Sequence, residues 1–262
     1  MRLARCRVPG ADRAGVGLER DGLLFEVAES WTEALELCTG AAPGAPTETG
    51  RWWPLSDCEL KAPMPDSGRG IICTGMNYMQ HNAEARGLLK AAPSDHPVFF
   101  LKLAASMAHP DAALPLDPSI SREFDWEIEL GVVIGKGGRD IHRDDVAGHV
   151  AGYTIVIDVT ARDLQRQHVQ WFIGKNVAAS SPIGPWVTTL DEAGYPPAAE
   201  LSLSVNGHEK QNAKTTEMIF NVASLISTAS RTIESDGVVL TSAKCFCRSA
   251  YLRLGAPPRF NR

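Results

Sequence analysis

The sequence predicts an α+β protein in which strands outnumber helices. An Asp21-Gly22 dipeptide separates two apolar-rich runs within residues 14–27, which is the strongest short-range signal for a β-hairpin. Apolar and β-branched runs of strand length recur along the rest of the chain, whereas one long segment, residues 218–233, has the spacing of an amphipathic helix. Many strands with few helices favour the α+β class.

The order of these elements predicts two parts. After the hairpin, a short helix is expected over residues 30–37, and a stretch rich in Gly, Ala, Pro and Thr at residues 40–50 indicates a surface loop or linker. Pro63, Pro65 and Gly68 place a boundary near residue 65. We therefore expect a small N-terminal β-rich unit over residues 1–65 and a larger domain over residues 66–262. Strands of the larger domain are expected at residues 70–74, 98–103, 124–134, 150–159, 184–188, 201–205 and 237–241.

Composition and charge limit the possible functions. The 262 residues are 44% hydrophobic and 22% charged, as in an ordinary globular protein, which argues against a disordered, collagen-like or coiled-coil chain. A net charge of −5 provides no positive field for nucleic acid or anionic lipid, so a small molecule is the expected partner. No stretch approaches the ~18 consecutive apolar residues of a membrane span, and no apolar segment follows the basic start. We therefore expect a cytoplasmic protein.

Two glutamates alternate with apolar residues in the segment 124–130. On a strand, Glu127 and Glu129 lie on one face roughly 7 Å apart, where they repel each other unless solvent or a cation intervenes. A solvated edge strand is one interpretation. The apolar run that follows, residues 132–134, indicates instead a strand covered on both faces, where bare acids are costly and a hard cation would compensate them.

A third carboxylate, Asp158, ends a β-branched run that is typical of a buried strand. A carboxylate there is expected to be paired, metal-bound or functional, and a hydrogen-bonded structural role is the alternative. Together Glu127, Glu129 and Asp158 would offer three oxygen ligands, a set that suits Mg²⁺ or Mn²⁺. No cluster of Cys or His residues argues for zinc.

Polar groups with possible catalytic roles flank these acids. In a helical conformation His81 and Glu84 share a face, so the carboxylate could orient the imidazole for general base work, although a surface ion pair gives the same spacing. Downstream of Asp158, Arg162, Gln165 and Lys175 could hold a substrate carboxylate or stabilise an oxyanion. For Arg162, pairing with Asp163 or Glu123 is the structural alternative.

Taken together, these residues resemble the fumarylacetoacetate hydrolase family, particularly its small acylpyruvase-like members. Order and spacing agree over residues 65–240, and the motifs that carry the resemblance are Gly75-Met-Asn-Tyr-Met-Gln-His, Phe124-Asp-Trp-Glu-Ile-Glu-Leu, Val150-Ala-Gly-Tyr, Asp158-Val-Thr-Ala-Arg-Asp-Leu-Gln, Gln170-Trp, Gly174-Lys, Pro182-Ile-Gly-Pro-Trp, Val205-Asn-Gly-His-Glu-Lys-Gln and Thr215-Thr-Glu-Met-Ile-Phe. The resemblance implies a β-rich mixed-sheet roll with peripheral helices after the N-terminal β unit, and a homodimer or higher oligomer.

The resemblance also implies roles for single residues. It implies a Mg²⁺ or Mn²⁺ held by Glu127, Glu129 and Asp158, and a water-activating dyad of His81 and Glu84. It places Lys175 at the oxyanion, and it implies substrate contacts by the residues Arg162, Gln165, Tyr78 and Thr241.

The implied reaction is hydrolysis of a C–C bond in an acylpyruvate or fumarylpyruvate type of β-diketo acid during catabolism. Water deprotonated by His81 would attack the distal carbonyl, and the metal and Lys175 would stabilise the departing pyruvate enolate. Oxaloacetate-type decarboxylation and 2-hydroxydienoate isomerisation are alternatives within the family.

The sequence departs from the family pattern at two places. Ala178 stands where a polar residue is expected, and the Thr-Gly-Thr-Pro loop is absent after Thr241. Residues 241–262 hold five basic and no acidic residues (Lys244, Arg248, Arg253, Arg259 and Arg262). We expect an atypical or truncated C-terminus, and a catalytically impaired member of the family is therefore a further hypothesis.

Overall fold

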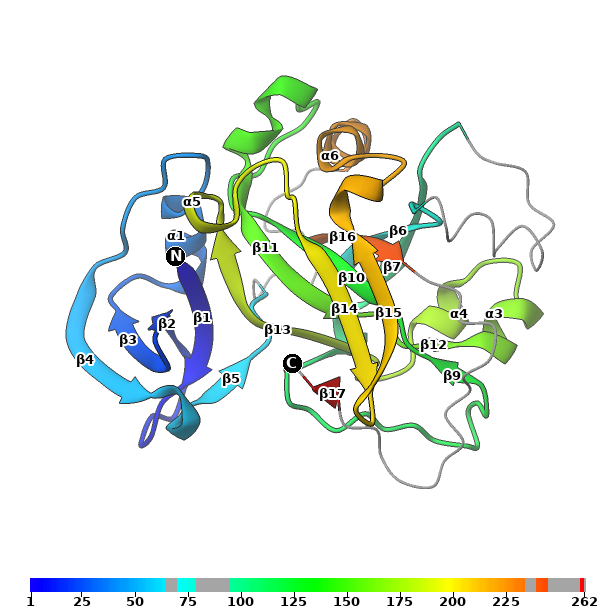
Figure 1. The fold of residues 1–262 in the computed structure, drawn as a ribbon, viewed down its shortest axis with the longest axis horizontal. Helices are drawn as coiled ribbons and strands as arrows, with labels where there is room; N and C mark the ends of the chain where they lie inside the picture. Colours follow the sequence, from blue (N-terminus) through cyan, green and yellow to red (C-terminus); the bar gives the residue numbers. More distant parts are fainter. Residues whose placement is uncertain (65–69, 79–94, 234–238, 245–259, 262) are drawn as a thin grey trace.

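The computed structural model describes residues 1–64, 70–78, 95–233, 239–244 and 260–261. Its centre is a twelve-stranded mixed sheet, in which β16 and β6 run parallel while most neighbours are antiparallel (Figure 1). The strand order is β4-β3-β2-β1-β13-β11-β10-β16-β6-β7, with β5 beside β1 and β8 beside β13. The predicted α+β class with a β-rich mixed sheet is thus confirmed.

The bounds of the elements follow the chain. The strands of the large sheet are β1 (Arg2–Arg7), β2 (Gly15–Arg20), β3 (Leu23–Val27), β4 (Glu48–Pro54), β5 (Glu59–Lys61), β6 (Ile71–Gly75), β7 (Val98–Lys102), β8 (Met107–Ala108), β10 (Ile128–Ile134), β11 (Val150–Ile157), β13 (Ser181–Thr189) and β16 (Val239–Lys244). A two-stranded sheet pairs β9 (Phe124–Asp125) with β12 (Thr160–Ala161), and a three-stranded sheet contains β14 (Glu200–Val205), β15 (His208–Lys214) and β17 (Phe260–Asn261). Among the described residues the α-helices are α1 (Trp31–Leu37), α3 (Arg162–Gln167), α4 (Phe172–Lys175), α5 (Leu190–Ala193) and α6 (Val222–Ser230).

The N-terminal strands form as the sequence predicts. Asp21 and Gly22 both have positive φ angles, 53° and 78°, which suit the tight turn that joins β2 and β3. Helix α1 begins with a capping box, in which the Ser30 side chain accepts from the Glu33 amide while the Glu33 carboxylate accepts from Ser30. Both the hairpin and the short helix therefore follow from local turn and cap chemistry.

The N-terminal strands continue the same sheet as the rest of the chain. β1 pairs with β13 in the register Arg2↔Thr188 and Leu3↔Val187, and Leu3 is completely buried in a core that also contains Val187 and Val133. In Figure 1 this unit lies at one end of the sheet, opposite α3 and α4. The division into residues 1–65 and 66–262 stays a prediction.

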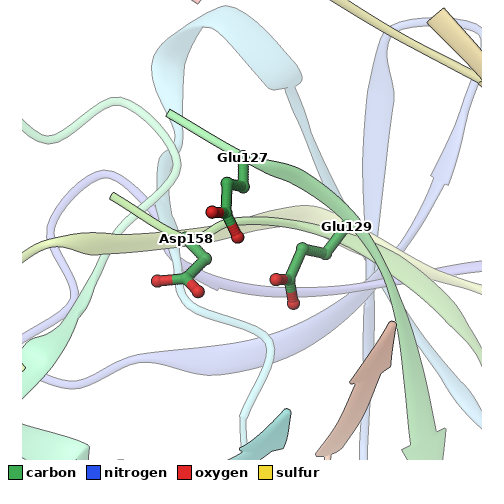
Figure 2. Close-up of side chains that lie close together, drawn as sticks. All are labelled: Glu127, Glu129 and Asp158. Atoms are coloured by element: carbon green, nitrogen blue, oxygen red, sulfur yellow. The ribbon is translucent and has the colours of Figure 1, made fainter. Parts of the chain in front are cut away.

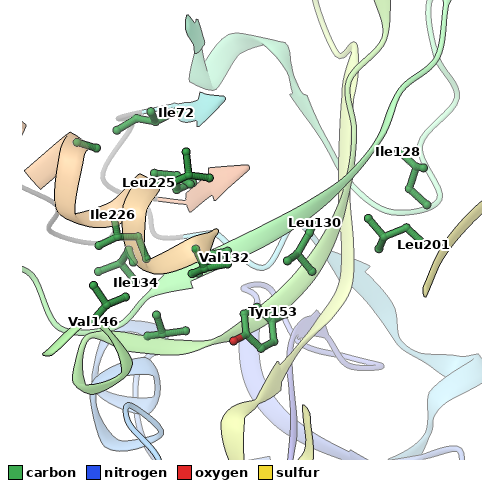
Figure 3. Packing of buried hydrophobic residues seen from close by; sticks show 14 of the residues in the cluster. Ile72, Ile128, Leu130, Val132, Ile134, Val146, Tyr153, Leu201, Leu225 and Ile226 are labelled. Atoms are coloured by element: carbon green, nitrogen blue, oxygen red, sulfur yellow. The ribbon is translucent and has the colours of Figure 1, made fainter. Parts of the chain in front are cut away.

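Strand β10 separates two cores. Alternate side chains Ile128, Leu130, Val132 and Ile134 pack into a cluster that includes Leu225 of α6, as Figure 3 shows. The residues between them face the opposite side, where Val133 joins the core beneath the N-terminal strands. Because all seven residues of β10 are buried, both faces of this strand are covered, as its consecutive apolar residues predicted.

The single strand expected over residues 124–134 is instead two strands. β9 pairs with β12, whereas β10 pairs with β11 and β16. Between them the side chain of Gln211 on β15 takes the place of a neighbouring strand, since it donates to the Trp126 carbonyl at 3.1 Å and accepts from the Ile128 amide at 2.8 Å. The residue that follows Trp126, Glu127, therefore lies at the break.

The amphipathic helix expected over residues 218–233 is also shorter. Helix α6 covers Val222–Ser230 and begins after Asn221, whose side chain accepts from the Ser224 amide at 2.9 Å. The residues before it are held by buried Asn77, which accepts from the Phe220 amide at 2.7 Å and donates to the Phe220 carbonyl at 2.9 Å. This tertiary contact fixes a non-helical backbone where the spacing alone indicated helix.

Two further predictions concern membrane-spanning segments and the C-terminal segment, and part of the C-terminal segment lies outside the described residues. Among the described helices none combines the length and the apolar character that crossing a bilayer requires. Of the atypical segment 241–262, residues 245–259 and 262 lie outside the description, while residues 241–244 complete β16 and residues 260–261 form β17.

We expect Leu3→Ala to destabilise the whole described sheet in one cooperative transition. Removing this buried side chain should cost about 2–5 kcal/mol of unfolding free energy, because it leaves a cavity where β1 meets β13. Thermal melting followed by far-UV circular dichroism measures the shift. Leu37→Ala, at a side chain 39% exposed, is the control and should shift the melting temperature little. Two separate transitions, of which only one moves, would show instead that the N-terminal unit melts independently.

Candidate active site

Three buried carboxylates converge at one end of β10 and β11. One oxygen from each of Glu127, Glu129 and Asp158 lies within 4.8 Å of the others, and Figure 2 shows the three side chains gathered at one place. Glu127 lies at the break before β10, Glu129 is within β10, and Asp158 follows β11 directly. The Asp158 amide donates to the Glu127 carbonyl at 2.8 Å, which fixes the two backbones side by side. The structure thus brings together the three acids that the sequence singled out.

Buried cations lie against two of these acids. The ammonium of Lys175 is 2.9 Å from a Glu127 oxygen and 2.5 Å from Asp158 Oδ2, while Lys102 lies 2.7 Å from Asp158 Oδ1. Arg162 contacts the other Glu127 oxygen at 2.5 Å and Asp125 at 2.8 Å. We call these seven residues the charge cluster: the acids Asp125, Glu127, Glu129 and Asp158 with the cations Lys102, Arg162 and Lys175. All seven are buried, and acids outnumber cations by one.

Glu129 lacks the compensation that the other acids have. It is completely buried, and neither carboxylate oxygen has a hydrogen bond of ordinary geometry or an ion pair among the described residues. Burial, reinforced by the neighbouring Asp158 charge, raises the pKa of Glu129 well above its ordinary value. A divalent cation would supply the positive charge that compensates this carboxylate. The three carboxylates therefore fit the Mg²⁺ or Mn²⁺ expected from the sequence.

Lys175 remains charged in this setting. Burial by itself lowers the pKa of an ammonium, but the Asp158 and Glu127 carboxylates outweigh it and raise the pKa of Lys175 above its ordinary value. Its Nζ also lies 4.9 Å from the centre of the Phe100 ring, a cation–π contact. A fixed positive charge therefore adjoins the three carboxylates.

Close packing of two short helices places Lys175. A Cβ atom on Gly174 would lie 2.7 Å from the Gln165 amide nitrogen and 2.8 Å from the Ala161 carbonyl oxygen, so only glycine allows α4 to approach α3. On the other side, the Asn176 side chain accepts from the Leu103 amide at 2.6 Å and donates to the Leu101 carbonyl at 3.0 Å. These contacts hold the end of α4 against β7.

Arg162 is held by acids other than those expected. The sequence offered Asp163 and Glu123 as partners, but its side chain contacts Asp125 and Glu127 and donates to Gln165 Oε1 at 2.9 Å. Glu123 pairs instead with Arg166, one turn further along α3. Arg162 and Gln165 thus hold each other beside the acids, and their contact with a substrate stays a prediction.

The other expected site residues have different positions. Thr241 is buried in β16 opposite Gly131 of β10, and its hydroxyl partly offsets the raised pKa of Glu129, which places it beside the acids. Tyr78 is buried and forms an isolated β-bridge with Met218. His81 and Glu84 lie outside the described residues. Substrate contacts of Tyr78 and Thr241 stay predictions.

Two members of the charge cluster were not identified from the sequence. Asp125 precedes the glutamates in the same alternating segment, so the pattern carried a signal for it. Lys102 ends the apolar strand Val98–Lys102, where a lone lysine is unusual, and that position was its signal. Neither signal identifies the partner, because the contacts join distant parts of the chain.

An apolar groove lies on the other face of the sheet. Its volume is about 400 Å³, and Ile128, Ile157 and Leu203 are among the residues that line it. Since Glu129 follows Ile128 on β10, its carboxylate points to the opposite face from the groove. The groove and the charge cluster are therefore separate features.

Comparison with known proteins identifies the family. The model of the fumarylacetoacetate (FAA) hydrolase C-terminal domain matches residues 70–242, which include the whole charge cluster. Oxaloacetate tautomerase YisK of Bacillus subtilis is 35% identical over 210 residues, which cover 79% of this chain and 68% of that protein. A 2,4-didehydro-3-deoxy-L-rhamnonate hydrolase of Sphingomonas is 36% identical over 235 residues, covering 89% of this chain and 79% of that protein.

Solved structures agree with this assignment. The crystal structure named as 5-carboxymethyl-2-hydroxymuconate delta-isomerase from Mycobacterium smegmatis has a TM-score of 0.75 and 31% sequence identity, covering 93% of this chain and 88% of that one. The family therefore contains enzymes named as hydrolases, tautomerases and isomerases. On the match of the family model over more than half of its length and on these relatives, the chain belongs to the fumarylacetoacetate hydrolase family.

Proposed function

We propose that the chain is a divalent-metal-dependent enzyme that hydrolyses a C–C bond in β-diketo acids of the acylpyruvate type. The observation that carries the proposal is the convergence of three buried carboxylates beside the charged ammonium of Lys175. A site of this composition suits a small acid with adjacent oxygens, which is the chemistry of a 2-oxo acid. A cytoplasmic location and a homodimer, both expected from the sequence, stay predictions.

Glu127, Glu129 and Asp158 would hold the cation. Because acids outnumber cations by one in the charge cluster, a bound Mg²⁺ or Mn²⁺ would compensate the charge that Glu129 carries once it is ionised. When bound, such an ion supplies Lewis-acid polarisation of carbonyl and carboxylate oxygens. The remaining chemistry falls to side chains of the chain itself.

Lys175 would stabilise the charge that develops on the substrate. Its ammonium has three N–H donors, and Glu127 and Asp158 accept two of them among the described residues. The third is available for an enolate oxygen, and because the group is buried and already oriented, it needs little rearrangement during the reaction.

His81 and Glu84 would activate water, as the sequence predicts. His81 would take a proton from water that attacks the carbonyl distant from the carboxylate, while Glu84 orients the imidazole. The C–C bond then breaks, its electron pair passes to the pyruvate fragment as an enolate, and protonation of the carbon gives pyruvate and a carboxylic acid. Arg162 and Gln165 would hold Glu127 and each other in place beside this reaction.

Keto–enol tautomerisation of oxaloacetate is the second candidate. It is favoured by the 35% identity to a protein named oxaloacetate tautomerase, and it needs the same enolate without attack by water. Isomerisation of a hydroxydienoate is supported in the same way by the Mycobacterium smegmatis structure. Oxaloacetate decarboxylation and a catalytically impaired chain are two further hypotheses that the sequence raises.

An assay with two substrates separates these functions. We expect the purified chain with Mn²⁺ to release acetate from acetylpyruvate and to lose this activity in a chelator. Acetate, pyruvate and CO₂ are measured separately, and decay of the oxaloacetate enol is followed by its ultraviolet absorbance. Accelerated enol decay with no acetate release would replace hydrolysis by tautomerisation, CO₂ release would indicate decarboxylation, and inactivity on both substrates despite Mn²⁺ binding would favour the impaired member.

Glu129→Gln should abolish the stabilisation that Mn²⁺ gives to the wild-type chain. Gln keeps the shape of the side chain but removes the buried negative charge, so the melting temperature without metal should change little while the rise on adding metal is lost. Differential scanning fluorimetry with and without Mn²⁺ measures both quantities. Glu209→Gln, at an exposed residue of β15, is the matched control and should respond to Mn²⁺ as the wild type does. An unchanged response in Glu129→Gln would remove this residue from the ligand set.

Lys175→Met should separate catalysis from metal binding. Loss of a positioned donor to an oxyanion should lower kcat by about 10²–10³-fold. Mn²⁺ affinity should stay equal or become tighter, because the substitution removes a cation that lies 2.9 Å or less from two ligands. Steady-state kinetics and Mn²⁺ titration together test this prediction. Wild-type kcat in the variant would exclude Lys175 from the reaction.

A further inference from the structure

We propose that Lys102 is a positioning residue that sets the geometry of Asp158 as a metal ligand and of Lys175 beside it. The inference rests on the proposed metal-dependent function. It concerns a residue that lies outside the catalytic set expected from the sequence, and it assigns Lys102 no contact with the substrate.

Every donor of Lys102 is engaged within the protein. The residue is completely buried, and its Nζ lies 2.7 Å from Asp158 Oδ1 and 3.3 Å from the Ser180 hydroxyl. It also donates to the Lys175 carbonyl and lies 3.4 Å from the Val159 carbonyl. An ammonium has three N–H donors, and the acceptors of Val159, Lys175 and Ser180 account for all of them, while the contact with Asp158 is an ion pair outside hydrogen-bond geometry. No donor is left for a substrate, so a role in binding or proton transfer does not fit.

The two oxygens of Asp158 contact different lysines. Lys102 Nζ lies 2.7 Å from Oδ1, whereas Lys175 Nζ lies 2.5 Å from Oδ2. An ion pair at one oxygen of a carboxylate limits the rotation of the whole group, and one Asp158 oxygen lies within 4.8 Å of an oxygen of each of the other two acids. Interactions of this kind orient metal ligands and tune their affinity.

Lys102 also fixes the backbone that carries Lys175. It donates to the Lys175 carbonyl, and the residues on either side of Lys102 are bound by Asn176, which accepts from the Leu103 amide and donates to the Leu101 carbonyl. Three consecutive residues at the end of β7 are therefore tied to Lys175, the last residue of α4, and to Asn176 after it. The buried side chain of Lys102 thus positions both Asp158, a proposed metal ligand, and Lys175, the proposed oxyanion donor.

Charge and geometry predict opposite effects of removing Lys102. If Lys102 only balanced charge, its loss would remove a cation near the site, and Mn²⁺ would bind more tightly. If it positions Asp158, its loss leaves Oδ1 without a basic partner and the carboxylate held at Oδ2 alone, and Mn²⁺ binds more weakly. Lys175→Met removes an equal charge from the same acid and provides the matched comparison.

The test is a Mn²⁺ titration of wild type, Lys102→Met and Lys175→Met, followed by the electron paramagnetic resonance signal of free Mn²⁺. We expect Lys102→Met to weaken Mn²⁺ binding by about 10–100-fold, while Lys175→Met binds Mn²⁺ as tightly as wild type or more tightly. Equal or tighter binding by Lys102→Met would overturn the positioning role and leave the proposed function standing. Failure of the wild type to bind Mn²⁺ would overturn the proposed function itself.

A measurement on the wild type keeps the inference testable if Lys102→Met does not fold. Acetylation of lysines by acetic anhydride, read by peptide mass spectrometry, reports whether Nζ is accessible. We expect Lys102 to remain unmodified with and without Mn²⁺, while exposed Lys136 is modified rapidly. Modification of Lys102 at the rate of Lys136 in the folded protein would show that its donors are not engaged, and it would overturn the inference.

Discussion

The burial of four carboxylates at one end of the sheet is the constraint on which the rest of the site depends. Transfer of an unpaired ion from water into a protein interior costs several kcal/mol, so each acid needs a partner or a proton. Lys102 arrives from β7, Arg162 from α3 and Lys175 from α4. The strand β7 and the helices α3 and α4, which pack at this end of the sheet, thus carry the compensating positive charges. The contacts that form the site are therefore also contacts that hold β7, α3 and α4 to this end of the sheet.

The same constraint fixes the register of β10. Because side chains alternate along a strand, Glu129 reaches the charge cluster only while Ile128 and Leu130 face the apolar core that contains Leu225. A slip of one residue would bury the carboxylate among these apolar side chains and would place isoleucine among ions. Opposite requirements on the two faces leave a single acceptable pairing with β11 and β16.

Local patterns in the sequence predicted what local chemistry determines. Alternation and apolar context identified Glu127, Glu129 and Asp158, and the Asp21-Gly22 turn fixed the hairpin. The patterns were insufficient where a distant side chain decides. Gln211 interrupts the strand through hydrogen bonds to Trp126 and Ile128, 85 and 83 residues away, and Asn77 delays the start of α6 from 143 residues away. Lys102 was missed for the same reason, since its partner Asp158 lies at the end of another strand.

The proposed role of the charge cluster would explain how one family can include enzymes named as hydrolases, tautomerases and isomerases. The three reactions share the formation of an enolate of a 2-oxo acid, and they differ in whether water attacks and where a proton returns. Glu129 and Asp158 lie in or beside central strands, and Lys175 is bound to β7 through Lys102 and Asn176. In the proposed chemistry, the residues that act in the shared step are thus the ones anchored to the sheet. In the proposed chemistry the cation site and the ammonium of Lys175 would stabilise the common enolate, so the groups that distinguish the reactions would need only to surround it.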